Sequence, residues 1–217
     1  MFDNINKFER IFLIFTGNSI NEIEERHWEK LKYEATIGIN HTFKIFHPTY
    51  LFFADKDVLY AVWNWYNDKK VKPIIYCRER AIYKKPDPDR YPELIPYAWV
   101  KNHIDETWNE KETQVHKDKP YGLNMNITPC WLFSILHECG YTGNVYMLGA
   151  DFYIEDDKYH FHNYHRNYYA KRKYENKLQE FKKFFESPYW DNKLKLFNCN
   201  PKSGLTKFPK VNLDDIL

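Results

Sequence analysis

The 217-residue sequence has little glycine, and it lacks the glycine-rich motifs that hold phosphates in two large classes of nucleotide-binding protein. Only seven glycines occur, and no segment fits the P-loop pattern GxxxxGK(S/T) or the dinucleotide pattern GxGxxG. This absence argues against a P-loop NTPase and against a standard dinucleotide-dependent oxidoreductase.

Cysteine and long apolar runs are also scarce. The four cysteines include no CxxC pair, and their spacing fits neither a disulfide framework nor a zinc knuckle. We therefore expect buried free thiols in a reducing compartment. The N-terminus carries Asp3 and Glu9 and has no signal-peptide core, and no run approaches the roughly 18 apolar residues of a membrane span. A cytoplasmic protein with no membrane span is expected.

A strong excess of charge of one sign is missing too. The formal net charge is +2, which predicts no nucleic-acid or membrane partner through long-range attraction. Hydrophobic residues make up 43% and charged residues 29%, ordinary values for a globular protein. A chain of this length can bury a core without disulfides or structural metal.

Apolar runs of strand length alternate with helical segments over the first 80 residues. Strands are predicted at 10–16, 35–40, 49–55 and 72–77, and helices at 20–32 and 58–65. Alternation of this kind is typical of a parallel sheet covered by helices on both faces. The fold class predicted is therefore α/β, a Rossmann-like, mostly parallel sheet with helices on both faces in a single domain.

The second half continues this pattern after an interruption. Five prolines fall at about 78–122, which predicts an excursion of loop with short strand or helix pieces. Helices are then predicted at 129–138 and 167–186, and strands at 144–148 and 193–197. The whole chain, 1–217, is predicted to be one domain.

Polar side chains follow the predicted strands. In open parallel sheets the crevice beyond the carboxyl ends of the strands is where ligands bind. A turn at a helix N-terminus offers N–H groups to phosphate, and Asn and Asp can bind ribose hydroxyls and base edges. Each residue alone also fits an ordinary loop or helix cap, but together they predict a nucleotide site. The strand-end residues are Gly17, Asn18, Ser19, Asn40, Asp55, Asp151, Asn200 and Ser203.

Three histidines, His160, His162 and His165, occupy a polar segment after the 144–148 strand. Their HxHxxH spacing has the ligand types of a metal site. It also fits a general base among substrate contacts, or a polar surface loop. No cysteine has the surroundings that activate a nucleophilic thiol.

The order of these elements resembles the bacterial sialyltransferases of glycosyltransferase family 42 and related phage and bacterial proteins. Residues 14–23 resemble the family's first strand, its Gly-Asn-Gly-Pro-Ser turn and the following helix, although the turn here is two residues shorter. Residues 127–153 resemble its Ile-Thr-Ser-Gly helix start and its Gly-Ile-Asp-Phe-Tyr strand end. Residues 194–203 resemble the last strand and its Cys-Pro-Asn-Ser turn. Residues 78–122 are not matched.

The resemblance implies a GT-A-like, nucleotide-sugar-binding domain over 1–217. It also implies inverting, metal-independent transfer of a sugar from a CMP-sialic-acid-like donor to an acceptor hydroxyl, on a glycan or another molecule. His165 matches the general base, and Tyr153 and Tyr159 match tyrosines that stabilise the departing phosphate. His162 stands where the family has a further tyrosine. Asn40 matches an asparagine that contacts the nucleotide, Asp55 falls near a second one, and Thr128 replaces a serine. No cofactor beyond the donor is implied.

Three alternatives stay open. Archaeal pterin diphosphokinases have a similar Gly-Ser turn, and on that interpretation Asp55 and Asp151 would bind Mg²⁺ and ATP phosphates. A phage glycosyltransferase acting on hydroxymethylated DNA bases is the second, with nucleic acid as the acceptor only. The third is a non-catalytic nucleotide-binding module. Dependence on Mg²⁺ separates the first alternative from glycosyl transfer.

Overall fold

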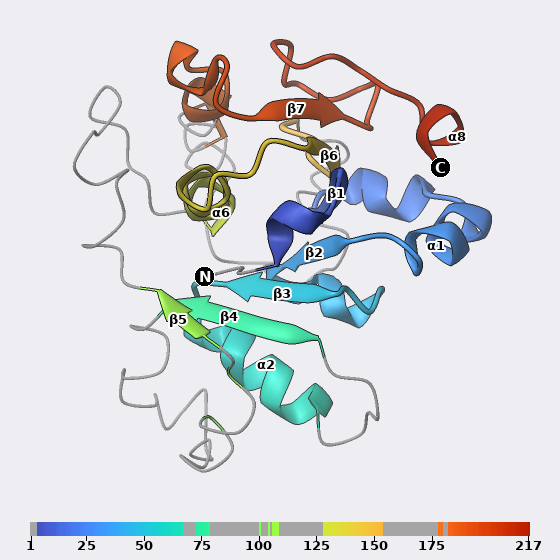
Figure 1. Ribbon diagram of the computed structural model, residues 1–217. Helices are drawn as coiled ribbons and strands as arrows, with labels where there is room; N and C mark the ends of the chain where they lie inside the picture. The colour runs from blue at the N-terminus through green and yellow to red at the C-terminus, as the bar shows by residue number, and fades with distance from the viewer. Residues whose placement is uncertain are drawn as a thin grey trace.

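A computed structural model describes residues 4–66, 73–78, 100, 104, 106–108, 128–153, 178–179 and 182–217. Their core is one seven-stranded sheet in the order β5-β4-β3-β2-β1-β6-β7, and every neighbouring pair of strands is parallel (Figure 1). The strands are β1 (Arg10–Ile14), β2 (Thr36–Ile39), β3 (Tyr50–Phe53), β4 (Ile74–Arg78), β5 (Glu106–Trp108), β6 (Asn144–Leu148) and β7 (Lys195–Asn198). The predicted Rossmann-like α/β class is confirmed.

The strands are continuous apolar runs because the central part of the sheet is covered on both faces. Every residue of β2 and β3 is buried. Alternate residues of β1 belong to opposite layers: Ile11 and Leu13 pack into one core cluster, and Phe12 and Ile14 into another. A polar residue at any of these central positions would be buried whichever way it pointed.

Helices cover the two faces. The α-helices are α1 (Glu25–Leu31), α2 (Lys56–Tyr66), α6 (Thr128–Glu138) and α8 (Leu213–Ile216), and the 3₁₀ helices are η1 (Ile5–Lys7), η2 (Asn18–Glu22), η3 (Asn40–Lys44) and η5 (Pro188–Trp190). Figure 1 shows α6 on one side of the central strands and α1 and α8 on the other. The residues of α6 pack with Ile11 and Leu13, and Leu31 of α1 and Leu213 of α8 pack with Phe12 and Ile14.

The predicted helix at 20–32 is wrong as one continuous element. The chain forms the 3₁₀ helix η2, passes through Ile23 and Glu24, and then begins α1. The first turn is fixed by a tertiary contact, because Ser19 bonds to Asp151, which is 132 residues away in the sequence. A tertiary contact of this kind overrides the local helix propensity of the segment.

Other boundaries differ by a few residues. The last strand is at 195–198 instead of 193–197. The excursion contains one short parallel strand, β5, at the sheet edge. Of the predicted helix at 167–186, residues 178–179 and 182–185 are helical and residue 186 is in a turn. The others lie outside the described residues. Among the described residues no helix is long and apolar enough to span a membrane. A single domain over 1–217 stays a prediction.

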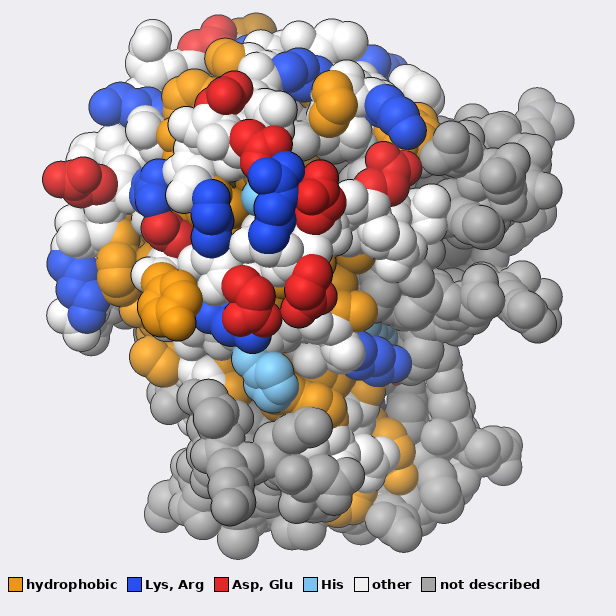
Figure 2. Space-filling view, turned by 90° about the vertical axis from the view of Figure 1, so that its right-hand side faces the viewer, with side chains coloured by type: hydrophobic (Ala, Val, Ile, Leu, Met, Phe, Trp, Pro, Cys, Tyr) orange, Lys and Arg blue, Asp and Glu red, His pale blue; other side chains and the backbone are white. Residues whose placement is uncertain are grey.

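Charged side chains of both signs are interspersed on the face that carries α1 and α8 (Figure 2). They form short-range pairs within and between elements, such as Lys32 with Glu29, and Arg26 with Glu24 and Asp214. No broad field of one sign covers this face in the view shown, in keeping with the small net charge.

The layer that joins α6 to the C-terminal segment depends on Phe133. Its side chain is fully buried, and its ring meets Phe185 edge-on at 4.9 Å and Trp190 at 5.7 Å between ring centroids. We predict that Phe133→Ala lowers the free energy of unfolding by about 3–5 kcal/mol, because the cavity cannot close. Urea unfolding measures this loss.

The control is Tyr33→Ala, since Tyr33 is 90% exposed. Its effect should stay within about 0.5 kcal/mol. A comparable loss in the two variants would contradict the packing described for α6.

Candidate nucleotide site at the carboxyl edge of the sheet

The sheet has a topological switch point between β1 and β6. From β1 the chain builds the sheet outward through β2, β3, β4 and β5, and it then returns to add β6 and β7 on the other side of β1. In folds with such a switch point, ligands bind beyond the carboxyl ends of the strands, beside the turns that leave the two central strands. The residues that follow these two strands are Gly17–Ser19 and Gly149–Asp151.

The Asp151 carboxylate joins three of the strand-end turns. It is 6% exposed, and its Oδ2 accepts a hydrogen bond from the backbone N–H of Ser19 at 2.9 Å. Its Oδ1 accepts from the Ser19 hydroxyl and from Asn200 Nδ2, the latter at 2.8 Å. A buried carboxylate is costly unless such donors satisfy it. The turns after β1, β6 and β7 are therefore held together by one charge.

The turn after β7 is fixed to the same point by a second set of hydrogen bonds. Asn198 Nδ2 donates to Ser203 Oγ at 2.9 Å, and the Ser203 hydroxyl donates to the carbonyl of Ala150 at 2.6 Å. Asn198 Oδ1 accepts from the Asn200 N–H at 2.9 Å. Asn198 was not predicted as a site residue; it is fully buried at the end of an apolar run, which is an unusual place for an amide. The Asp151 cluster comprises Gly17, Ser19, Asp151, Asn198, Asn200 and Ser203.

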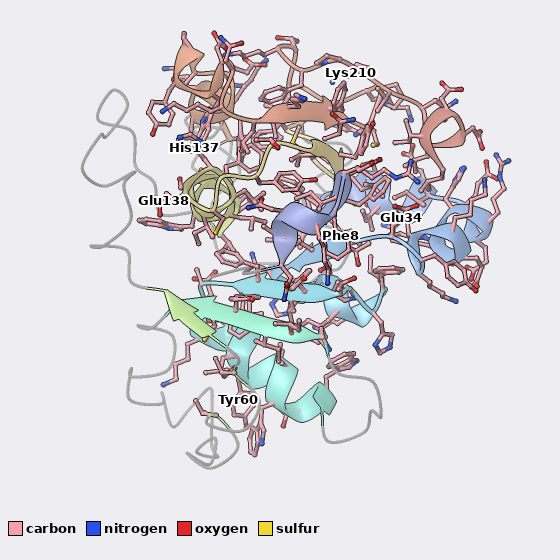
Figure 3. All side chains as sticks on the ribbon, in the orientation of Figure 1. Phe8, Glu34, Tyr60, His137, Glu138 and Lys210 are labelled. Carbon is pink, nitrogen blue, oxygen red and sulfur yellow. The ribbon has the colours of Figure 1, made fainter. Side chains whose placement is uncertain are left out.

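Lys210 supports this turn from the C-terminal side (Figure 3). Its ammonium donates to the carbonyls of Ser203 at 3.1 Å and Leu205 at 2.6 Å. Burial lowers the pKa of Lys210, and the nearby Glu186 carboxylate opposes that shift. The side chain therefore fixes the backbone that carries Ser203.

Gly17 is required by a close approach of backbones. A Cβ at this position would lie 2.2 Å from the carbonyl oxygen of Gly149 and 2.6 Å from Asp151 Cγ. The Gly17 N–H donates to that same carbonyl at 3.0 Å. With the Ser19 N–H bound to Asp151, two N–H groups of the turn are used inside the protein, which differs from the expectation that they hold phosphate.

Two other predicted residues lie beyond neighbouring strands at the same edge. Asn40 follows β2 with φ of 55°, and its buried Oδ1 has no hydrogen-bond partner. Asp55 follows β3 at the start of α2, where its carbonyl accepts from the N–H groups of Val58 and Leu59 at 3.2 Å each. Asp55 thus occupies a helix-cap position.

Thr128 is the first residue of α6, and it is 3% exposed. Because α6 leads into the amino end of β6, the N-terminus of α6 must lie at the carboxyl edge of the parallel sheet. This 11-residue helix directs the positive end of its dipole to the edge where the crevice opens.

The opposite end of α6 carries His137 and Glu138 (Figure 3). Burial lowers the pKa of His137, and Lys193 adds to the effect. A perturbed histidine can mark a functional site, but this one lies at the amino edge, away from the switch point.

The remaining predicted catalytic residues are unevenly placed. Tyr153 is half-buried just after Asp151 and Phe152. His160, Tyr159, His162 and His165 lie outside the described residues. Within the part of the chain that the structure describes, no three His, Cys, Asp or Glu side chains are grouped so as to hold a metal ion.

The cysteines have the properties of packing residues. Burial raises the pKa of Cys77 and of Cys199 to about 12, and it raises that of the fully enclosed Cys130 as well. Each thiol stays protonated at neutral pH and is a poor nucleophile. All four cysteines are free.

Comparison with known proteins gives a likeness of fold. No family model matches the chain, and no curated protein matches it in sequence. A solved structure, the MAf glycosyltransferase from Magnetospirillum magneticum AMB-1, superposes with a TM-score of 0.54 at 10% sequence identity. The match covers 95% of this chain and 34% of that one, so the chain spans about a third of the length of the Magnetospirillum protein.

The contact of Asn200 with Asp151 gives a pH-dependent prediction. Asn200→Asp replaces the donating amide by a second carboxylate of the same shape, facing Asp151. We expect a loss of about 3 kcal/mol in the free energy of unfolding at neutral pH. In the folded variant the repulsion between the two facing carboxyls raises the pKa of one of them above its value in the unfolded chain. At acidic pH that carboxyl is still protonated in the folded state, whereas in the unfolded chain it has lost its proton. The folded state then binds more protons, so the stability of the variant falls as pH rises.

Urea unfolding of Asn200→Asp and the unchanged protein across acidic to neutral pH measures this difference. Asn21→Asp is the control, because Asn21 is exposed and its amide donates only to Asn18. It should change stability by less than about 0.5 kcal/mol. A loss for Asn200→Asp that is the same at every pH would show that the two side chains do not face one another.

Proposed function

We propose that this protein is a glycosyltransferase resembling family 42, which transfers a sugar from a CMP-sugar to an acceptor hydroxyl with inversion. The observation that carries the proposal is the convergence of polar strand-end residues at the β1/β6 switch point, fixed around Asp151. The Magnetospirillum protein with this fold is a glycosyltransferase, which supports the same reaction class.

The nucleotide would be bound by groups at this edge that can still accept a hydrogen bond or attract a phosphate. Asn40 Oδ1 is a buried acceptor with no partner, and a ribose hydroxyl or a base amino group would satisfy it. The N-terminus of α6, with Thr128 at its start, offers a positive potential to the phosphate. Asp151 acts by holding the Gly17–Ser19 turn and Asn200 in place.

The chemical step is assigned through the resemblance. His165 takes the proton of the acceptor hydroxyl as the new glycosidic bond forms and the bond from sugar to phosphate breaks. CMP leaves with the bonding electrons, and hydroxyl groups of Tyr153 and Tyr159 stabilise the charge on its phosphate. His162 stands in place of the family's third tyrosine. No metal takes part in this scheme.

The geometry around Asp151 weighs against the Mg²⁺-dependent diphosphokinase alternative. That alternative needs Asp55 and Asp151 as oxygen ligands for the metal. Both Asp151 oxygens already accept hydrogen bonds from Ser19 and Asn200. Freeing Asp151 for a cation would release three turns at once.

Nucleotide binding can be tested by thermal unfolding with CMP, UDP, GDP and ATP, each in Mg²⁺ or EDTA. We predict that CMP raises the melting temperature equally in both, by the equivalent of about 2.7 kcal/mol at 100 times its Kd. Stabilisation by ATP with Mg²⁺ alone would support the diphosphokinase instead. Stabilisation by UDP or GDP would keep glycosyl transfer and assign a different donor nucleotide. No stabilisation by any of the four nucleotides would favour a non-catalytic module.

The role of the base is tested separately. We predict that His165→Ala lowers the turnover of a CMP-sugar by about 10²–10⁴-fold and leaves stabilisation by CMP unchanged. His47→Ala serves as the control, since His47 is exposed beside Trp65. Unchanged turnover in His165→Ala would remove His165 from the mechanism.

A further inference from the structure

A cavity of about 300 Å³ lies beside the Asp151 cluster, on the face that carries α1 and α8. One wall of the cavity belongs to the turns that Asp151 joins, and it consists of Ser19, Gly149 and Asn200. Its other walls come from η2, the start of α1 and the C-terminal residues Asn212–Asp214. We call it the C-terminal cavity. Its volume is at the lower end of the range of small-molecule sites, about 300–1,000 Å³, and suits one sugar ring better than a dinucleotide.

Carboxylates and a buried imidazole form most of its polar wall. Glu22, Glu24 and Asp214 contribute the carboxylates. His27, which is 5% exposed, places its Nε2 atom 2.9 Å from Asp214 Oδ1. Asp214 is thus held at the cavity by a side chain from α1, and Asn200 and Asn212 add amide groups.

These carboxylates already have cationic partners. Glu24 lies 2.7 Å from Arg26, Asp214 lies 3.0 Å from Arg26, and Glu22 lies 3.4 Å from Lys202. A hydrogen bond from Arg26 lowers the pKa of Glu24, and one from His27 lowers the pKa of Asp214, so both are ionised at neutral pH.

This charge pattern limits the ligand. The three carboxylates outnumber their two cationic partners, Arg26 and Lys202, so the wall keeps a net negative charge that disfavours a phosphate or the carboxylate of a sialic acid. A metal ion is also disfavoured, because each carboxylate is paired with a basic side chain and no group of metal-holding residues occurs among those described. A ligand that carries hydroxyl groups and no charge meets neither obstacle.

The remaining wall is apolar. Ile23, Leu148 and Leu213 line it together with Pro201 and Cys199. A sugar ring has hydroxyl groups around its rim and C–H groups on its faces. Carboxylate and amide oxygens can accept from those hydroxyls, and the aliphatic side chains can cover the C–H face.

We propose that the C-terminal cavity is the acceptor site and binds a neutral, hydroxyl-rich sugar ring through Glu22, Glu24, Asp214 and Asn200. This proposal rests on the proposed glycosyl transfer. The shared wall at Ser19 and Asn200 places the acceptor beside the turns of the proposed nucleotide site. The anionic donor is then bound near the N-terminus of α6, and the neutral acceptor among carboxylates.

The test is a titration of the CMP-saturated protein with glucose, galactose, N-acetylglucosamine and lactose, followed by the amide NMR signals of Ser19, Ile23 and Leu213. At least one neutral sugar should shift these signals at millimolar concentration, and N-acetylneuraminate should not. Glu22→Ala should weaken that sugar about tenfold, the effect of losing one hydrogen bond to a charged group.

Glu29→Ala is the matched control. Its carboxylate is 53% exposed and pairs with Lys32, as that of Glu22 is 51% exposed and pairs with Lys202, but it lies on α1 outside the cavity. It should leave the affinity for the sugar unchanged.

The outcomes separate the two proposals. If CMP binds and no neutral sugar shifts these signals, or if Glu22→Ala binds the sugar as well as Glu29→Ala does, the acceptor site is overturned. Equal binding of N-acetylneuraminate would overturn the neutral class of acceptor. Sugar binding without any nucleotide binding would overturn the proposed function and keep the sugar site.

Discussion

The hydrogen bonds of the Asp151 carboxylate hold the carboxyl edge of this sheet in order. One buried negative charge accepts from Ser19 after β1 and from Asn200 after β7, while its own backbone follows β6. Removing either donor would leave a buried charge undersatisfied, which costs more than the hydrogen bond itself contributes. The three turns are therefore coupled, and the switch-point crevice has a fixed wall on one side.

The same constraint explains why Gly17 and Gly149 are found here. The backbone after β1 must approach the carbonyl of Gly149 so closely that no Cβ fits at Gly17, and Gly149 itself has φ of 67°. In a chain with few glycines, two lie in the turns that follow β1 and β6. Their use here is to bring backbones together around Asp151.

The sequence predicted the sheet better than the details of its edge. The bounds of β6 were predicted to the residue, because a strand buried on both faces is a continuous apolar run with no competing signal. The break after η2 was missed, since it depends on a contact between Ser19 and Asp151, 132 residues apart. A strand-end aspartate such as Asp55 fits a ligand site and a helix cap equally well in sequence; its carbonyl caps the first turn of α2, and its role in a ligand site stays a prediction.

Charge is divided between the two sides of this edge. The N-terminus of α6 presents a positive potential, whereas the C-terminal cavity presents carboxylates from η2, the start of α1 and the C-terminal segment. A transferase that joins an anionic donor to a neutral acceptor can use this division to keep each substrate on its own side. The Asp151 cluster lies at the boundary and contributes Ser19 and Asn200 to the cavity wall.

The most direct test of this account is a crystal structure of the protein with CMP. The account predicts CMP at the carboxyl ends of β1, β2 and β6, with a ligand hydroxyl or amino group on Asn40 Oδ1, and Asp151 still bonded to Ser19 and Asn200. A nucleotide bound elsewhere would contradict it, as would an Asp151 side chain turned away from Ser19 to coordinate a metal–phosphate group.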